Sequence, residues 1–297
     1  IATHVEGSIL KKALFWLKAK RKISQILGNN ELRPDIVHIH SAADWSFHRK
    51  AIIMKLCKRH GVRCVLHIHS GKFDQWCGSY ESRTSRKVRK SILSSKAAVV
   101  VLSEYWSEKL APIIGPVTAI CNPLPYGRIE NSTITSRDEK SVLLLGRNDP
   151  VKAHDFAIRA VELARKSDSG ITLTMTGIGE GSNEWLSAKG WVDENEKLSM
   201  LQNLGVLLIP SKYEGQPMVM VEALSFGLPI ICSDSLPPTP KSVLRVRGDD
   251  LDAWAKTIVQ VCSKPPSIDS VMSDAEPFSI HNINEQWDSL YCSILDI

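Results

Sequence analysis

The sequence predicts an α/β protein made of two consecutive units, each a parallel sheet covered by helices. From residue 34 onward, short β-forming runs alternate with longer stretches of helical periodicity, as such sheets require. The alternation stops at a polar stretch with few apolar residues, 127–140, and restarts after it. A chain of 297 residues is too long for one ordinary core and suits two domains.

The first unit opens with the apolar run 35–40, which we expect to form a buried strand. Gly61 ends the helix that follows, and Ser103 is placed to cap a later short helix. The expected strands are 35–40, 62–69, 97–102 and 117–121, and the expected helices are 46–60, 83–95 and the one after Ser103. A doubly wound domain normally opens with a strand and a tight glycine turn, and nothing before residue 34 supplies them. We therefore expect the first domain to lack its opening strand–turn segment in this chain.

The second unit repeats the alternation and looks complete. Its expected strands are 141–145, 171–176, 206–209 and 229–232, and its expected helices are 155–166, 194–204, 217–226 and 250–261, with a last helix at about 283–295. We divide the chain into an incomplete first domain (1–125), a linker (126–140), a second domain (141–275) and a C-terminal helix (276–297). That helix is expected to pack back toward the first domain.

The bulk composition is typical of a soluble globular protein, with 43% hydrophobic and 23% charged residues. Every apolar run is well short of the ~20 residues that a membrane-spanning helix needs. The seven cysteines form no C-x-x-C pair, which argues against a disulfide framework and against a zinc site. We therefore interpret the cysteines as reduced thiols and expect a cytoplasmic location.

Positive charge gathers in two segments of a chain whose net charge is +5. Residues 11–22 place six Lys and Arg side chains around apolar residues that include Leu10, Leu14 and Leu17, and residues 83–90 hold five more. Such a basic amphipathic stretch can contact an anionic membrane, and the alternative is an ordinary solvated helix face. No RNA- or DNA-binding motif accompanies the charge, so we expect no nucleic-acid partner.

The segment with the most chemical information runs from 211 to 223, between an apolar strand and a helix. Pro217 suits a first helical turn, where its missing N–H costs nothing. The amides near Gly215, Gln216 and Met218 would point out of the helix N-terminus, which is a natural seat for phosphate. The segment therefore predicts a site for a phosphorylated ligand.

Two glutamates flank this helix start, with Glu214 on the loop before it and Glu222 inside the helix. Seven residues separate them, so their carboxylates could reach different parts of one ligand. The alternative is that Glu214 interacts with the helix dipole and Glu222 is a surface charge.

Two further loops follow expected strands and precede helices. In the first, Gly146 leads into Arg147 and Lys152, whose spacing would let a guanidinium fork and a mobile ammonium converge on a diphosphate. In the second, the turn at Gly177 would let a nucleotide approach the backbone, although an isolated G-x-G is a weak motif.

Taken in this order, the segments resemble the retaining nucleotide-sugar glycosyltransferases of the GT-B fold, family 4 (glycosyl transferases group 1). The motifs are the G-R-x4-K loop at 146–152, the turn at Gly177 and the E-x7-E pair at 214 and 222. In the first half, 35–40, 66–71 and 101–104 are similar to the acceptor-domain strands of the family, and Asn122-Pro123 to its interdomain crossing. The resemblance covers nearly the whole chain from residue 34. It implies two Rossmann-like domains that face a central cleft.

The resemblance implies a role for each motif on the donor. Arg147 and Lys152 would neutralise the donor diphosphate and stabilise the leaving nucleotide as negative charge develops. Trp191 and Val192 would lie beside the base, and Glu222 would accept hydrogen bonds from the ribose hydroxyls. The implied donor-binding residues are Gly146, Arg147, Lys152, Gly177, Trp191, Val192, Gly215, Gln216, Met218 and Glu222.

The resemblance also implies the catalytic residues Glu214, His40 and His69. Glu214 would hold the hydroxyls of the donor sugar, and His40 or His69 would reach in from the other domain near the reacting carbon. The implied reaction moves a hexose-type sugar from a nucleotide diphosphate to a glycan or lipid-linked acceptor, with retention at the anomeric carbon. No metal and no other cofactor is expected, and the nucleotide-sugar is a co-substrate. Ala153 stands where the family usually has glycine after the loop lysine, and a small residue there is expected to fit at slight cost.

Two patterns could suggest metal sites. In each H-x-H pair (His38/His40 and His67/His69) both side chains share one face of a strand, but no carboxylate or cysteine completes either set. We interpret one histidine of each pair as a packed or hydrogen-bonded neighbour. The D-x-D at 250–252 opens a helix, where capping carboxylates are expected, so we interpret it as a cap.

Other function classes fit the sequence less well. A nicotinamide dehydrogenase should show an early G-x-G-x-x-G after a strand, and that fingerprint is absent from the sequence. A nucleotide-sugar epimerase of the same fold, or a catalytically silent sugar-nucleotide-binding protein, would bind the same donor without transferring the sugar. These two alternatives remain open at this stage.

Overall fold

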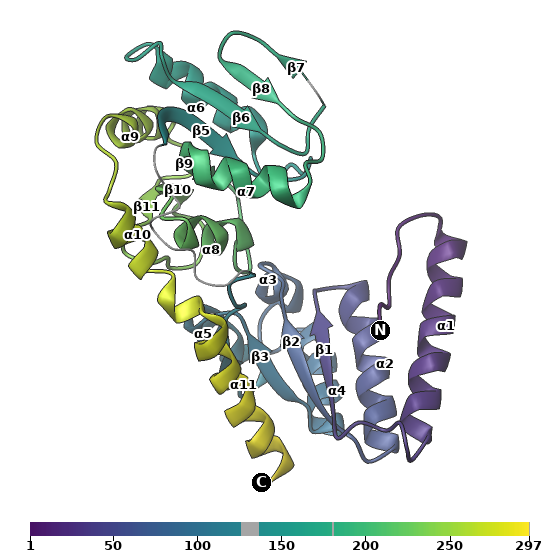
Figure 1. The fold of residues 1–297 in the computed structure, drawn as a ribbon. Helices are drawn as coiled ribbons and strands as arrows, with labels where there is room; N and C mark the ends of the chain where they lie inside the picture. The colour runs from purple at the N-terminus through teal and green to yellow at the C-terminus, as the bar shows by residue number, and fades with distance from the viewer. Residues whose placement is uncertain (126–136, 180, 297) are drawn as a thin grey trace. The chain divides into compact units, whose positions relative to one another are not determined.

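The computed structural model describes residues 1–125, 137–179 and 181–296. It confirms the predicted α/β class, because each of two compact units holds a largely parallel sheet with helices packed on it (Figure 1). Unit 1 consists of Ile1–Cys121 together with Glu285–Ile297, and unit 2 consists of Asn122–Asn284.

Unit 1 is a four-stranded parallel sheet with the strand order β1-β2-β3-β4. Its elements in chain order are α1 (Ile9–Gly28), β1 (Ile36–Ser41), α2 (Trp45–Arg59), β2 (Arg63–Ile68), α3 (Phe73–Cys77), α4 (Arg83–Ser95), β3 (Ala98–Val101), α5 (Glu104–Ile114) and β4 (Thr118–Ala119). The hydroxyl of Ser103 accepts a hydrogen bond from the amide of Trp106, so the predicted cap of α5 is confirmed.

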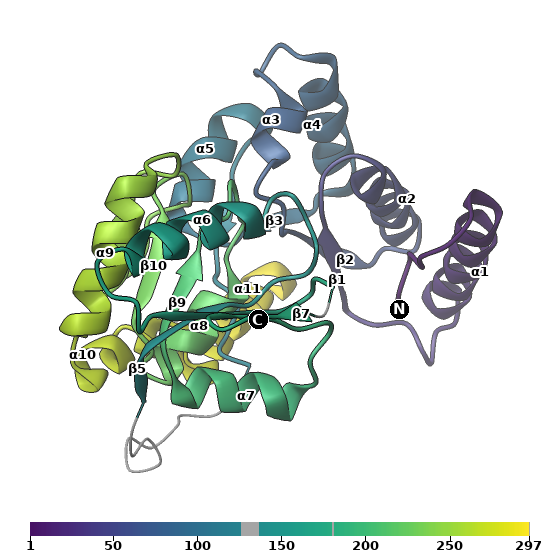
Figure 2. The same ribbon diagram turned by 90° about the horizontal axis from the view of Figure 1, so that it is seen from above.

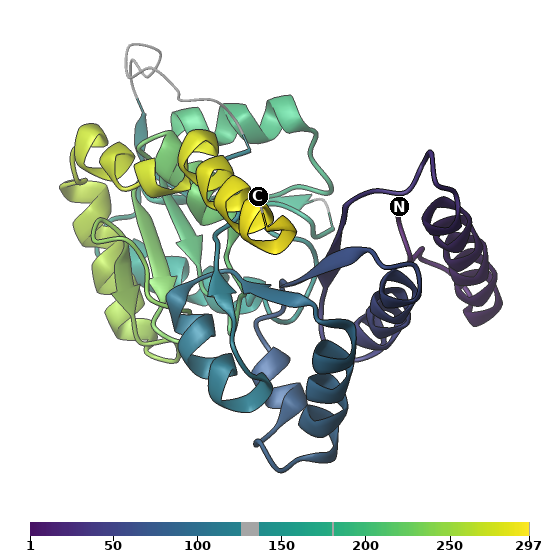
Figure 3. The same cartoon turned by 90° about the horizontal axis from the view of Figure 1, so that it is seen from below.

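The two faces of this sheet are covered differently. Ile39, Leu66 and Val101 point into one core with Phe47 and Ile53 of α2. The other face of β1 and β2 carries histidines. Those histidines lie against the second half of α11 (Ile280–Leu295), the last helix of the chain, which Figure 3 shows in yellow.

Unit 2 is a seven-stranded sheet with the order β11-β10-β9-β5-β6-β8-β7, in which only the β7–β8 pair is antiparallel among the described strands. Its elements are β5 (Asp138–Leu144), α6 (His154–Arg165), β6 (Thr172–Met175), β7 (Gly181–Ser182), β8 (Leu186–Ala188), α7 (Glu194–Asn203), β9 (Leu204–Ile209), α8 (Met218–Ser225), β10 (Ile230–Ser233), β11 (Leu244–Val246), α9 (Leu251–Ser263), α10 (Ile268–Ser273), a 3-10 helix (Glu276–Phe278) and the first turns of α11. Figure 2 shows α6 and α9 on one face of the sheet and α7 and α8 on the other.

The element boundaries differ from those expected at a few places. Strand β5 begins at Asp138, so the last residues of the predicted linker 126–140 belong to the sheet, while 126–136 lie outside the described residues. The short elements α3, β7, β8, β11 and α10 were not predicted. The last helix begins at Ile280, and the contacts divide it between the two units at Glu285.

All seven cysteines are free thiols. Five of them are buried, and Cys292 is exposed on α11. Burial raises the pKa of Cys232 and of Cys262 to about 11, which leaves both as inert packing residues at neutral pH. Within the described residues, every helix falls short of the length and apolar character that crossing a membrane demands.

Candidate active site

A cavity of about 500 Å³ lies in unit 2, where the loops after β5, β6 and β9 meet the N-terminal ends of α7 and α8. This is the carboxyl edge of a parallel sheet, where α/β folds bind their ligands. The predicted site residues that line it are Gly146, Arg147, Lys152, Gly177, Trp191, Val192, Glu214, Gln216, Met218 and Glu222. Gly215 lies between Glu214 and Gln216 on the same loop. The structure thus brings segments far apart in the sequence to one cavity.

One side of the cavity carries the two basic residues of the loop after β5. The Lys152 ammonium lies 2.6 Å from a carboxylate oxygen of Glu214, and both side chains are about four-fifths buried. Arg147 is exposed, and in the described part of the chain no carboxylate forms an ion pair with it. An anion entering here meets one cation that is already positioned and a second that is free to fold onto it.

The opposite side carries a second buried ion pair. Glu222 is 6% exposed, and its carboxylate accepts a hydrogen bond of 3.0 Å from Lys197 on α7. Burial raises the pKa of Glu222, and the hydrogen bond from Lys197 opposes that shift. Glu194 also pairs with Lys197 at 3.0 Å; burial lowers the pKa of Lys197, but its hydrogen bonds to Glu194 and Glu222 outweigh burial and raise it. Glu222 is therefore not the surface charge that was the alternative interpretation.

The N-terminus of α8 faces the same cavity. Pro217 is the residue that precedes the helix rather than its first residue, and Met218 and Val219 begin the helix and line the cavity. The first amides of a helix have no acceptor within the helix and carry the positive end of its dipole. An anion at this point in the cavity would complete their hydrogen bonding.

Gly177 is required for a reason that the sequence did not reveal. Its φ is +74°, and a Cβ at this position would lie 2.1 Å from the carbonyl oxygen of Gly146 and 2.6 Å from the Cα of Arg147. The amide of Gly146 also donates to the hydroxyl of Thr176 at 3.2 Å. The glycine thus allows the loops after β5 and β6 to touch, and the expected close approach of a nucleotide is not needed to explain it.

Gln216 is held by its side chain. Its Oε1 accepts a hydrogen bond of 2.7 Å from the backbone amide of Asn122, and its Nε2 donates to the carbonyl of Asn122 at 3.3 Å. The side chain therefore fixes the start of unit 2 to the loop before α8. Only the backbone of Gln216 is left to face a ligand from this side.

The remaining wall is aromatic and open. Trp191 lines the cavity and is 86% exposed, which is unusual for the largest apolar side chain. Val192 beside it is half-buried, and Asp193 then caps α7 by accepting a hydrogen bond from the amide of Glu196. The segment that leads into α7 thus presents an indole ring to solvent.

Two residues were missed in the sequence, one in the wall of this cavity and one that supports its helices at their far ends. Lys197 looked like an ordinary charge on a helix, and only the folded chain places it against Glu222. Arg137 lay in the predicted linker, yet its guanidinium donates to the carbonyls of Leu201 and Leu204 at the end of α7 and of Phe226 at the end of α8. Burial lowers its pKa to about 10, so it remains charged at neutral pH. Neither residue carries a local sequence signal.

The predicted catalytic histidines lie in unit 1, where the sheet brings the two H-x-H pairs together. Residue 40 of β1 is in register with residue 67 of β2. His40 Nδ1 lies 2.7 Å from His69 Nε2, and His38 Nε2 lies 3.2 Å from His67 Nδ1. His38 Nδ1 also lies 2.7 Å from the hydroxyl of Tyr291 on α11.

All four imidazoles are held neutral. Burial, reinforced by the neighbouring histidines, lowers the pKa of His67 to about 2 and those of His38 and His69 to about 4. Burial and the charge of Lys50 lower the pKa of His40 as well. At neutral pH each ring thus offers one N–H and one lone pair.

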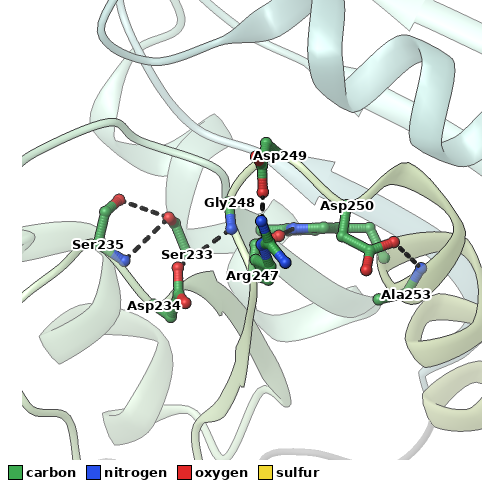
Figure 4. Close-up of polar contacts among 9 residues, drawn as sticks. Ser233, Asp234, Ser235, Arg247, Gly248, Asp249, Asp250 and Ala253 are labelled. Carbon is green, nitrogen blue, oxygen red and sulfur yellow. Dashed lines mark hydrogen bonds and ion pairs between the residues drawn. The ribbon is translucent and has the colours of Figure 1, made fainter.

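The D-x-D pattern lies outside the cavity. Figure 4 shows the carboxylate of Asp250 accepting a hydrogen bond from the amide of Ala253, at 2.9 Å, at the start of α9. In the same view Arg247 pairs with Asp249, and Asp234 accepts from the amide of Gly248. The interpretation of Asp250 as a helix cap is therefore confirmed.

Comparison with known proteins agrees with this architecture. Residues 139–264 match the family described as glycosyl transferases group 1, and residues 6–126 match the glycosyl transferase 4-like domain. A glycogen synthase of Mycobacterium tuberculosis is 26% identical in an alignment of 239 residues that covers 73% of this chain and 56% of the relative. The chain thus spans little more than half the length of that relative.

Solved structures share the fold. The structure of TarM superposes with a TM-score of 0.68 at 18% identity, over 91% of this chain and 57% of that one. The pneumococcal O-GlcNAc transferase GtfA, in complex with UDP and GlcNAc, gives 0.69 at 16% identity, over 93% and 60%. The chain therefore has the GT-B fold that these structures share, and two successive parts of it match glycosyltransferase domain families.

Proposed function

We propose that the protein transfers a hexose-type sugar from a nucleoside diphosphate donor to a glycan or lipid-linked acceptor, with retention of configuration and without a metal at the diphosphate. The observation that carries the proposal is the unit 2 cavity, which joins a cationic loop, a helix N-terminus, a buried carboxylate and an exposed indole. These four features match the diphosphate, ribose and base of one donor molecule. The UDP bound to GtfA supports a donor of this class.

The diphosphate would bind between Arg147, Lys152 and the first amides of α8. As the bond to the leaving nucleotide breaks, negative charge grows on the phosphate oxygens, and preorganised cations and amide dipoles stabilise it. The Lys152 ammonium is already fixed by Glu214, so little ordering is needed when the donor arrives. This arrangement does the work that a divalent cation does in other transferases.

The nucleoside would lie along the other wall. Glu222, oriented by Lys197, has a carboxylate suited to accept the two ribose hydroxyls. The exposed face of Trp191 beside Val192 is suited to stack on the base. Stacking is tolerant of base identity, so the selection between bases would fall to the backbone around it.

The sugar would lie beyond the diphosphate, with its hydroxyls on Glu214 and the loop amides of Gly215 and Gln216. His40 or His69 would contact it near the anomeric carbon. The acceptor hydroxyl attacks on the face from which the diphosphate departs, so the new carbon–oxygen bond replaces the old one on the same side. The proton of the hydroxyl passes to the departing phosphate oxygen, which balances the step.

A thermal-shift titration of the full chain with UDP, GDP and ADP, and with their sugar conjugates, tests the donor site first. One nucleotide is expected to stabilise the protein by about 2.7 kcal/mol when its concentration is a hundred times its Kd. Arg147→Ala and Glu222→Ala should abolish the shift. Lys166→Ala, which removes an exposed cation at the end of α6, is the matched control and should keep it. Equal shifts in all variants would overturn the assignment of the cavity.

Two alternatives would pass that binding test. An epimerase would convert the sugar nucleotide without an acceptor, and a silent binding protein would leave it unchanged. Incubation of the donor with and without glycan or lipid-linked acceptors, followed by chromatography of the sugar, separates the three outcomes. Release of nucleotide that depends on an acceptor supports transfer.

We also propose contact with an anionic membrane, on its cytoplasmic side, through α1. The apolar side chains Leu10, Leu14 and Leu17 are 57–77% exposed and are flanked by lysines, while Ile23 and Leu27 of the same helix are buried. Sedimentation with vesicles of phosphatidylglycerol or of phosphatidylcholine tests it. Binding only to the anionic vesicles, lost in Leu14→Ser, is expected. If equal amounts of protein remain in the supernatant with the anionic and with the neutral vesicles, the proposed membrane contact is wrong.

A further inference from the structure

The histidine cluster of unit 1 offers more than the sugar contact proposed for it. His38, His40 and His67 each present a ring nitrogen, and these three nitrogens lie within 4.8 Å of one another. They come from two adjacent strands and share one face of the sheet, because side chains two residues apart point the same way. The backbone positions are therefore fixed by the sheet rather than by a loop.

We propose that His38, His40 and His67 bind a first-row transition-metal ion of the Zn²⁺ class. Zinc–nitrogen bonds of 2.0–2.1 Å at tetrahedral angles place ligand nitrogens about 3.3 Å apart. The nitrogens of His38 and His67 already lie 3.2 Å apart, so that edge of the tetrahedron is formed. Small rotations of the ring of His40, which is exposed but hydrogen-bonded to His69, would bring the third nitrogen into place.

A buried atom without a partner lies in the same cluster. His67 is 3% exposed, and its Nε2 has no hydrogen-bond partner within the part of the chain that the structure describes. Hydrogen bonds link Tyr291 to His38 and His38 to His67. Whichever residue donates in each of these bonds, Nε2 of His67 remains without a partner. An ion on Nδ1 of His67, the nitrogen that faces His38, would fix the proton of this imidazole on Nε2 and leave Nε2 as a buried N–H without an acceptor.

The surroundings favour a metal that prefers nitrogen. The hydroxyl of Tyr291 lies on the second nitrogen of His38, and orienting contacts of this kind commonly support histidine ligands. Trp287 packs on both His38 and His67, which shields the inner side of the site. A set of three imidazoles suits Zn²⁺, Cu²⁺ or Ni²⁺ and is unsuited to Mg²⁺ or Ca²⁺, which prefer oxygen.

Taken separately, neither H-x-H pair predicts a metal site. Two ligands per pair are too few, but the register of β1 and β2 merges the pairs. His69, hydrogen-bonded to His40, lies at the rim of the same cluster. The positive charge of Lys50 acts on His40 and will weaken binding, so we expect an affinity on the order of 1 µM rather than tighter.

The experiment uses the full chain, stripped with a chelator and titrated with Co²⁺ as a visible probe. One Co²⁺ per chain is expected, with the intense d–d absorption of a tetrahedral nitrogen site, and Zn²⁺ should bleach it. His38→Gln and His40→Gln should each weaken binding by at least about tenfold. His48→Gln, on an exposed residue of α2, is the matched control and should bind as the wild type does.

Circular dichroism of the metal-free variants establishes that they are folded. Absence of the band at about 100 µM Co²⁺, a hundredfold above the expected Kd, would overturn the proposal. An unchanged band in His40→Gln, or a sulfur charge-transfer band that reports cysteine ligation, would overturn it equally.

Metal binding has one consequence that rests on the proposed function. His40 is also proposed to contact the sugar, so an ion on it should inhibit transfer without changing the UDP thermal shift. The Co²⁺ titration needs neither donor nor acceptor, and failure of the proposed function therefore leaves its outcome readable.

Discussion

Replacing Gly177 with alanine tests the contact between the loops after β5 and β6, which line the unit 2 cavity. The residue has a φ of +74°, which costs alanine about 1–2 kcal/mol relative to ordinary backbone. The added methyl would also lie 2.1 Å from a carbonyl oxygen and 2.6 Å from a Cα, both of them backbone atoms that cannot rotate away. Forced repacking of this kind costs about 1–3 kcal/mol, so we expect Gly177→Ala to lower the free energy of unfolding by roughly 2–5 kcal/mol.

The matched control is Gly179→Ala, two residues further along the same loop. A Cβ at Gly179 meets nothing within 4 Å, and its φ is not in the left-handed region. Equilibrium unfolding in urea, followed by circular dichroism, should therefore leave Gly179→Ala within about 0.5 kcal/mol of the wild type. If the free energies of unfolding of the two variants differ by less than about 1 kcal/mol, Gly177 is not required for the close contact between the loops after β5 and β6. The nucleotide thermal shift should also weaken in Gly177→Ala alone, since Arg147 must move.

Two other predictions concern the same unit. Ala153 has a left-handed φ of 55°, so Ala153→Gly should relieve about 1–2 kcal/mol of strain, lose about half of that gain to chain entropy and raise the free energy of unfolding. Ala160→Gly, inside α6, should lower the free energy of unfolding by about 1 kcal/mol. Equal changes in the two variants would contradict the assignment of strain to Ala153. The pKa of Glu222 is raised above its ordinary value of 4.5, so its contribution to stability is largest below pH 4.5 and is lost as the pH rises through the raised value. Urea unfolding from pH 4 to 8 should show the wild type losing stability relative to Glu222→Gln over that window, and a gain would mean that the Lys197 hydrogen bond outweighs burial.

The parts of the fold that follow from local sequence were predicted well. The strand predicted at 35–40 lies at 36–41, the helix predicted at 83–95 has those bounds, and Ser103 and Asp250 cap helices as their positions indicated. The β7–β8 hairpin escaped prediction because its strands have two and three residues, too few to show a period. Strand β5 was expected to begin later because its first three residues are exposed and charged.

The candidate site was predictable only where a motif marks it. The loops around Lys152 and Glu214 could be placed at strand ends, so their convergence follows from the topology of a parallel sheet. The partner of each charge could not be predicted. Lys197 meets Glu222, and His40 meets His69, through contacts between residues 25 and 29 positions apart, which no local pattern encodes. The contact between Gly177 and Gly146 could not be predicted for the same reason, because Gly146 belongs to another strand end.

Arg137 couples the positions of α7 and α8, the two helices that line the unit 2 cavity. The guanidinium of Arg137 donates hydrogen bonds to carbonyls at the C-terminal ends of both α7 and α8. The helix that follows Trp191 and the helix that carries Glu222 are therefore linked at these ends. A ligand that draws one helix inward must either carry the other with it or stretch these hydrogen bonds. If the cavity binds the proposed donor, substitutions at position 137 would therefore change the base and ribose contacts together without touching the ligand.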